Sequence, residues 1–178
     1  MLLIRHGESE WNVPFGAVRI DAGIPDPELT ARGRQQAMDA AAGLERQGIR
    51  RIIASPYRRT LQTASIIAAK LGVDIEVEAL VRERCAFSCD QGTSRDELQR
   101  AWPDLDFSAL ADRWWGARIE SVRSIEQRAG TFLRRTETLA DRDHILVVCH
   151  WGFILAATGQ SVDNAAIVRV ASSTAGNR

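Results

Sequence analysis

Two of the three histidines in this sequence follow short apolar runs. His6 stands one residue after the run 2–4, and His150 comes directly after the run 145–149. If both runs are neighbouring parallel strands, the two side chains lie at the carboxyl end of one sheet, where ligands bind in α/β proteins. A neutral imidazole nitrogen can attack phosphorus and form a covalent phosphohistidine. The pair therefore indicates a candidate site for phosphoryl chemistry.

The residues around these positions suit such a site. Arg5 precedes His6 and disfavours the imidazolium form, which keeps the ring neutral near pH 7. Gly7 permits a close backbone approach. Guanidinium groups bind the oxygens of a phosphoryl group, and Arg58 and Arg59 follow the second apolar run of the chain. Arginine is disfavoured at a helix N-terminus, so we expect these two side chains and Arg5 to converge on the site.

The elements that must position these residues alternate along the chain. Apolar runs predict strands at 2–4, 52–54, 73–77, 145–149 and 167–170, and helical patterns cover 31–47, 57–71, 95–102, 121–139 and 153–157. Three prolines and two glycines predict an irregular loop over 10–30, and the tail 172–178 is expected to fray. Strands that alternate with helices indicate an α/β fold with a largely parallel sheet.

Length and composition exclude several classes of protein. The 178 residues predict one domain, 1–178, and 23 basic against 23 acidic residues argue against a nucleic-acid binder. No run of 18 apolar residues predicts a membrane span. The start MLLIRHG lacks the features of a signal peptide, so we expect a cytoplasmic protein in which Cys85, Cys89 and Cys149 are reduced thiols.

Several motifs resemble one family in chain order. Residues 3–12 (LIRHGESEWN) are similar to the RHGE(T/S)xWN signature of the histidine phosphatase superfamily, the phosphoglycerate mutase-like proteins. Residues 29–37 resemble its LTxxGxxQA helix start, and 55–64 resemble its SPLxRAxQTA segment. Residues 147–150 resemble the strand that carries the family's second histidine, and Glu83 stands where the family has its acidic residue.

The resemblance implies a fold and a set of roles. The family fold is a three-layer α/β/α sandwich with a mostly parallel, mixed sheet, and its chemistry needs no metal ion or other cofactor. His6 would be the nucleophile that becomes phosphorylated. Arg5, Arg59 and His150 would hold the phosphoryl group, with Asn12 as an additional donor.

The resemblance also gives Glu83 a role that its neighbours alone do not indicate. Glu83 would protonate the leaving oxygen and then activate water, which requires a raised pKa. From the sequence alone it is one charge between Arg82 and Arg84, which would lower that pKa. Glu8 is expected to orient the loop after the first strand rather than to take part in the chemistry.

Some residues depart from the family pattern. Trp151 replaces the glycine that commonly follows the second histidine, and it could wall the pocket or restrict substrates. Arg58 is the variable neighbour of the family arginine. The segment of about 84–118 is predicted to be a cap-like insert beside the site, and its three tryptophans could line the mouth or form core. The exposed loop 13–28 could act as a lid.

Three functions compete. We favour hydrolysis of a small-molecule phosphomonoester by a phosphatase, because the family's mutases are longer and carry an extra basic insert. Mutase-type phosphoryl transfer and a non-catalytic phosphate-binding protein are the alternatives. A metal or thiol site is disfavoured, since Cys85 and Cys89 form only one loose pair and Cys149 ends a buried run. The sequence indicates no oligomeric state.

Overall fold

A five-stranded sheet in the order β3-β2-β4-β1-β5 forms the centre of the molecule. The computed structural model describes residues 1–116 and 118–171. The strands are β1 (Leu2–Arg5), β2 (Arg51–Ala54), β3 (Asp74–Val77), β4 (Ile145–Cys149) and β5 (Ile167–Arg169). The first four are parallel, and β5 pairs antiparallel with β1 at the edge. The predicted mixed sheet is confirmed.

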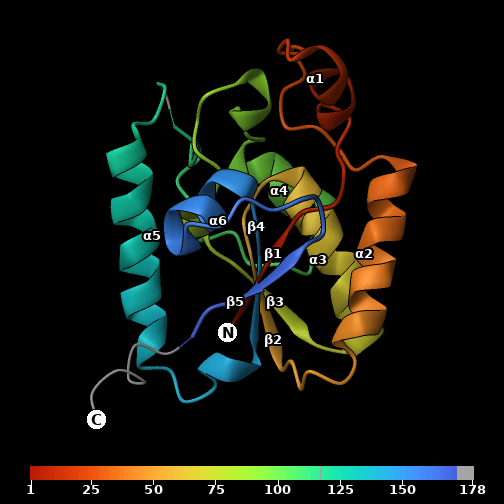
Figure 1. The fold of residues 1–178 in the computed structure, drawn as a ribbon, viewed down its shortest axis with the longest axis vertical. Helices are drawn as coiled ribbons and strands as arrows, with labels where there is room; N and C mark the ends of the chain where they lie inside the picture. Colours follow the sequence, from red (N-terminus) through yellow and green to blue (C-terminus); the bar gives the residue numbers. More distant parts are fainter. Residues whose placement is uncertain (117, 172–178) are drawn as a thin grey trace.

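Helices cover both faces of this sheet (Figure 1). The larger ones are α2 (Ala31–Leu44), α3 (Arg58–Leu71), α5 (Val122–Glu137) and α6 (Trp151–Thr158). Side chains alternate along the strands, so Leu2 and Ile4 join the core under α2 and α3, while Leu3 joins the core under α5 and α6. The three-layer α/β/α sandwich is therefore confirmed.

Local chemistry sets the ends of two helices beside the site. The hydroxyl of Thr30 accepts the backbone N–H of Gly33 at 3.0 Å and caps α2. Helix α2 ends at Leu44 and a turn over 45–48 follows, so the predicted helix was too long. Helix α3 ends at Gly72, whose φ of 67° suits a glycine.

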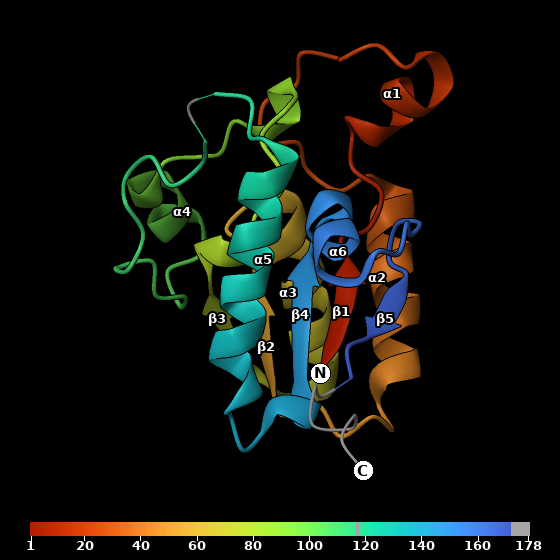
Figure 2. The same cartoon turned by 60° about the vertical axis from the view of Figure 1, so that its left-hand side comes forward.

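The prediction of an irregular loop over 10–30 was wrong in part. Helix α1 (Asn12–Val18) lies within it, although it contains Pro14 and Gly16. Pro14 falls in the first turn, where its missing N–H has no partner to lose. Helix α1 buries none of its residues, and it projects above the end of the sheet to which the strands point (Figure 2).

The segment 84–118 packs its aromatic residues inward. It contains the 3-10 turn η2 (Ser88–Asp90) and helix α4 (Arg95–Ala101). Trp114 is 7% exposed and its ring lies 4.6 Å from that of Tyr57. Trp102 and Trp115 pack against the same core. Of the two roles considered for these tryptophans, the structure favours core.

Two further 3-10 turns, η1 (Ala79–Val81) and η3 (Arg142–His144), connect the elements. No helix among the described residues is long and apolar enough to cross a membrane. The predicted fraying of 172–178 lies outside the described residues.

Candidate active site

The carboxyl ends of β1 and β4 bring two histidines together. In the parallel pairing of these strands Arg5 lies opposite Cys149. His6 and His150 are the residues that directly follow the two strands. The backbone N–H of His6 donates to the Cys149 carbonyl at 3.0 Å. The two ring centroids are 5.2 Å apart. Both side chains are buried, so the pair is shielded from water.

A hydrogen bond fixes which nitrogen of His6 carries the proton. Nδ1 lies 2.7 Å from the carbonyl oxygen of Gly7. Because a carbonyl oxygen can only accept, Nδ1 carries the hydrogen and Nε2 keeps its lone pair. Burial, and then the charges of Arg59 and Arg5, hold the pKa of His6 well below its usual range. His6 is therefore a neutral imidazole whose Nε2 can act as a nucleophile.

His150 lies between Ser55 and Tyr57. Its Nε2 is 2.8 Å from Ser55 Oγ, and the Tyr57 ring lies edge-on with its centroid 5.1 Å away. Nδ1 of His150 is buried and has no hydrogen-bond partner among the described residues. Burial is the main reason that the pKa of His150 is well below its usual range. An unpaired buried polar atom is costly, and an oxygen of a bound ligand would satisfy it.

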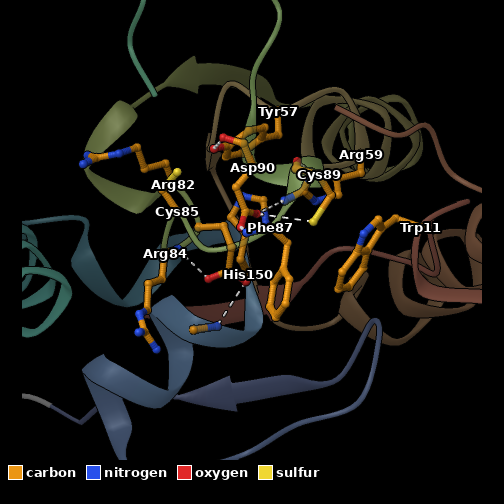
Figure 3. A network of polar contacts seen from close by, with 12 residues as sticks. Trp11, Tyr57, Arg59, Arg82, Arg84, Cys85, Phe87, Cys89, Asp90 and His150 are labelled. Carbon is orange, nitrogen blue, oxygen red and sulfur yellow. Dashed lines mark hydrogen bonds and ion pairs between the residues drawn. The ribbon is translucent and has the colours of Figure 1, made fainter. Parts of the chain in front are cut away.

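Arg59 brings a buried positive charge from the first turn of α3. It is 2% exposed, and its guanidinium lies 4.4 Å from the centre of the Tyr57 ring. It donates to the Cys89 carbonyl at 2.8 Å and to Asp90 Oδ1 at 3.4 Å (Figure 3). A guanidinium has five N–H donors, so these two bonds leave donors for an oxyanion.

Arg5 adds a second guanidinium beside His6. One terminal nitrogen, Nη1, donates to the Val162 carbonyl at 2.9 Å. Its Nε is buried and has no hydrogen-bond partner among the described residues. Arg5 and Arg59 both lower the pKa of His6 through their charge, so both predicted arginines act on His6.

Two glycines let the loop after β1 pack against α2. A Cβ on Gly7 would overlap the Gly33 carbonyl, and a Cβ on Gly33 would overlap the Glu8 carbonyl. Asn12 Oδ1 accepts both the backbone N–H and the hydroxyl of Ser9, each at 2.9 Å. These contacts give Gly7 and Asn12 a part in fixing the shape of the loop that carries His6.

Glu83 is hydrogen-bonded to the first turn of α6, the helix that follows His150. Its Oε1 accepts the backbone N–H of Arg84 at 2.7 Å, and its Oε2 accepts that of Gly152 at 3.2 Å. Burial raises the pKa of Glu83, and the charge of Asp90 raises it further. The neighbouring arginines in the sequence suggested the opposite shift. Burial outweighs the contributions that lower the pKa, which come from the N–H groups of Arg84 and Gly152 and from the charge of Arg59.

A second carboxylate, Asp90, was not among the predicted site residues. Its Oδ2 accepts the backbone N–H groups of Ala86 and Phe87 at 2.9 and 3.0 Å. Its Oδ1 faces Arg59, and the side chain is 1% exposed. The one sequence signal was the Cys-Asp-x-Gly segment at 89–92. Asp90 thus ties the segment 86–90 to the guanidinium in the site.

Two predicted residues have their side chains engaged elsewhere. Arg58 forms an ion pair with Glu28 at 2.6 Å on the partly exposed side of α3. Trp151 is 40% exposed, and its indole N–H donates to Ser161 at 3.0 Å. The structure therefore gathers His6, His150 and Arg59 without these two side chains.

The cysteines form no cluster with other metal-binding side chains. Among the described residues, no group of three or more His, Cys, Asp or Glu could hold a metal ion. Cys85, Cys89 and Cys149 are all free thiols. Burial raises the pKa of Cys89 and of Cys149, which keeps both thiols protonated and unreactive.

Relatives support an assignment of the site to one family. The family model of the histidine phosphatase superfamily (branch 1) matches residues 1–170. A probable phosphoglycerate mutase, GpmB, of Escherichia coli O1:K1 / APEC is 46% identical over 81 residues. These residues make up 46% of this chain and 36% of that protein, so the match spans little more than a third of the relative.

Solved structures share the fold. A mycobacterial glucosyl-3-phosphoglycerate phosphatase superimposes with a TM-score of 0.65 at 22% identity, covering 94% of this chain and 87% of that one. An ecdysone phosphate phosphatase from Bombix mori, in complex with tungstate, gives a TM-score of 0.65 at 19% identity, with 93% and 86% covered. Since the family model spans nearly the whole chain, the protein belongs to the histidine phosphatase superfamily.

Proposed function

We propose that the protein is a phosphatase that hydrolyses small phosphomonoesters through a phosphohistidine on His6, without a metal ion. One arrangement carries the proposal. The Nε2 lone pair of His6 lies in a buried site with the charges of Arg5 and Arg59. The unpaired Nδ1 of His150 adds a further polar atom there. A dianionic phosphoryl group needs this combination of a nucleophile and surrounding donors.

In the first step, Nε2 of His6 attacks phosphorus and the bond from phosphorus to the ester oxygen breaks. Arg5 and Arg59 neutralise the charge on the non-bridging oxygens. When Ser55 donates its hydroxyl proton to Nε2 of His150, the imidazole hydrogen sits on Nδ1 and can donate to one of these oxygens. The product is a phosphohistidine and an alcohol.

Glu83 moves the proton in both steps. Burial raises its pKa, which favours the protonated carboxyl that gives its proton to the leaving oxygen. The resulting carboxylate then takes a proton from water, and the oxygen of that water attacks phosphorus. The phosphorus–nitrogen bond breaks, inorganic phosphate leaves, and both His6 and Glu83 return to their starting forms.

Phosphoglycerate mutase activity is a second candidate, favoured by the name of the Escherichia coli relative. A mutase must hold the substrate carboxylate while the phosphoryl group returns to a different hydroxyl. Arg58, the arginine beside Arg59, pairs its guanidinium with the Glu28 carboxylate at 2.6 Å instead of facing the site. This distribution of charge supports hydrolysis over mutase activity.

The test is hydrolysis of p-nitrophenyl phosphate from acid to neutral pH with excess chelator. The His6→Ala variant is compared with His144→Ala, which removes the half-buried histidine whose Nδ1 lies against the Gly48 carbonyl. We expect turnover that survives the chelator, disappears in His6→Ala and persists in His144→Ala. An acid-labile phosphoenzyme that is trapped in the wild type and in His144→Ala, but not in His6→Ala, would support the intermediate.

Other outcomes contradict the proposal in distinct ways. Loss of activity with chelator would overturn the metal-free mechanism. Conversion of 3-phosphoglycerate to its 2-phospho isomer faster than phosphate release would favour the mutase. Phosphate binding without any turnover would identify a non-catalytic binding protein.

A further inference from the structure

Three aromatic rings lie together at one side of the active site. The rings of Trp11 and Phe15 are stacked with centroids 4.2 Å apart and planes 19° from parallel. Phe87, from the segment 84–118, lies 5.2 Å from each of them. We call these three residues the aromatic cluster. Its members come from segments far apart in sequence, so the tertiary fold assembles it.

Two hydrogen bonds to Asp90 connect the cluster to the phosphoryl site. The backbone N–H of Phe87 donates to Oδ2 of Asp90 at 3.0 Å, and Oδ1 of the same carboxylate faces Arg59 at 3.4 Å. Figure 3 draws Phe87, Asp90 and Arg59 in one close-up, together with Trp11 and His150. One carboxylate therefore separates the Phe87 backbone from the guanidinium that would hold the phosphoryl group.

The cluster is accessible mainly at Phe87, because Trp11 is buried beneath it at 7% exposure. Phe87 is 43% exposed, and Val13, Val18 and Ile20, on and after α1, are 54%, 60% and 67% exposed. Large apolar side chains that gather at the surface near a catalytic site commonly mark a binding surface. The exposed face of Phe87 can thus contact a bound molecule.

Asp21 connects Trp11 to the segment that carries Phe87. Its carboxylate accepts the indole N–H of Trp11 at 2.7 Å and the backbone N–H of Ser88 at 2.8 Å. It also accepts the Ser88 hydroxyl. These bonds lower the pKa of Asp21, because they stabilise its charged form. The rings are therefore held in place before any ligand binds.

The charges near the cluster favour an uncharged occupant. In the described part of the chain, the cation that contacts the cluster is Arg19. Its guanidinium carbon lies 5.7 Å from the centre of the Phe15 ring. Asp21, which accepts hydrogen bonds from both Trp11 and Ser88, adds a negative charge beside the cluster. An anionic leaving group would meet this carboxylate, whereas an apolar ring would stack or pack edge-on against the aromatic faces.

We propose that the aromatic cluster of Trp11, Phe15 and Phe87 is a leaving-group subsite that selects phosphomonoesters of alcohols carrying an apolar, planar ring. The inference rests on the proposed function, because it assigns the substrate class of the same site. The ester oxygen projects from the phosphoryl site past Asp90, and the ring of the alcohol contacts Phe87.

The test compares two primary alcohol esters of similar reactivity, 2-phenylethyl phosphate and propyl phosphate. We expect kcat/KM to favour the aromatic ester by about tenfold, because one aromatic pair with Phe87 stabilises by up to about 1.5 kcal/mol. In Phe87→Ala this ratio falls by several fold, while Phe87→Leu retains part of it. The matched control is Met38→Ala, which removes an exposed apolar side chain on α2 and keeps the wild-type ratio.

Calorimetry with 2-phenylethylphosphonate and propylphosphonate, which cannot be hydrolysed, measures binding without turnover. It separates the proposed subsite from the proposed phosphatase activity. A preference for 2-phenylethylphosphonate over propylphosphonate that is lost in Phe87→Ala supports the subsite even if neither ester is hydrolysed, an outcome that overturns the proposed phosphatase. Hydrolysis of both esters with equal kcat/KM overturns the subsite alone. Equal binding without hydrolysis overturns both.

Discussion

The backbone N–H of Gly152 donates to Oε2 of Glu83 at 3.2 Å, and a Cβ on this glycine would overlap the other carboxylate oxygen. The contact joins the proposed general acid to the first turn of α6, directly after His150. The helix that follows the second histidine therefore also sets the position of Glu83.

The variant Gly152→Ala is expected to lower kcat for p-nitrophenyl phosphate by about tenfold or more, because displacement of a positioned acid removes much of its contribution. Stability changes little, since alanine favours a helix over glycine. Gly43→Ala on α2, where a Cβ meets open space, is the matched control. Equal kcat in both variants would contradict the assigned position of Glu83.

The variant Asp90→Asn is expected to shift the pH profile of kcat/KM. Burial and the charge of Asp90 raise the pKa of Glu83. A general acid is active only when protonated, so activity falls as the pH rises through this pKa. Removal of the Asp90 charge lowers the pKa and moves the alkaline limb to lower pH. The exposed Asp104→Asn control keeps the wild-type limb, and an unshifted limb in Asp90→Asn would rule out this coupling.

The two buried histidines predict lower stability in acid. Burial holds the pKa of His6 and of His150 below 6.5 in the folded protein. Below pH 6.5 the unfolded chain therefore binds protons that the folded chain does not, and the free energy of unfolding falls by about 1.4 kcal/mol per pH unit for each histidine. Urea unfolding at several pH values measures this slope. The His6→Asn variant has one titrating histidine fewer, so its unfolding free energy changes less steeply with pH. An identical slope in both proteins would contradict the prediction.

Asp26 connects three parts of the structure and its loss is expected to be costly. Its buried carboxylate accepts the backbone N–H groups of Arg58 and Thr93 at 2.9 and 3.0 Å, and the Thr93 hydroxyl at 2.7 Å. Asp26→Ala leaves these donors without their acceptor and lowers the free energy of unfolding by about 2–4 kcal/mol. Urea denaturation checks the value. A loss as small as that of the exposed Asp104→Ala would argue against this role.

The positions of the two histidines could be predicted because local apolar patterns indicate where strands end. Arg58 and Arg59 could not be separated in this way. Adjacent residues on a helix point about 100° apart, so Arg59 enters the site while Arg58 reaches Glu28. Which of the two faces inward depends on how α3 packs against the sheet.

Helix α1 and Asp90 show why the remainder was missed. Pro14 and Gly16 weaken the local helix signal over 12–18, and the helix is supported by stacking of Phe15 on Trp11 and by contact with Phe87. Asp90 lies in an irregular segment, where no periodicity reports burial. Both features arise from contacts between segments distant in sequence, which a local pattern does not contain.

The position of β1 in the sheet has a consequence for synthesis of the protein. β1 lies between β4 and β5, and Leu2 pairs with Leu146 and with Arg169. As the ribosome extends the chain, both edges of β1 stay without their native partners until these late strands emerge. Such non-local pairing slows folding and leaves strand edges open to association with other chains. His6 is therefore made well before β4 and β5, the strands that complete the sheet around it.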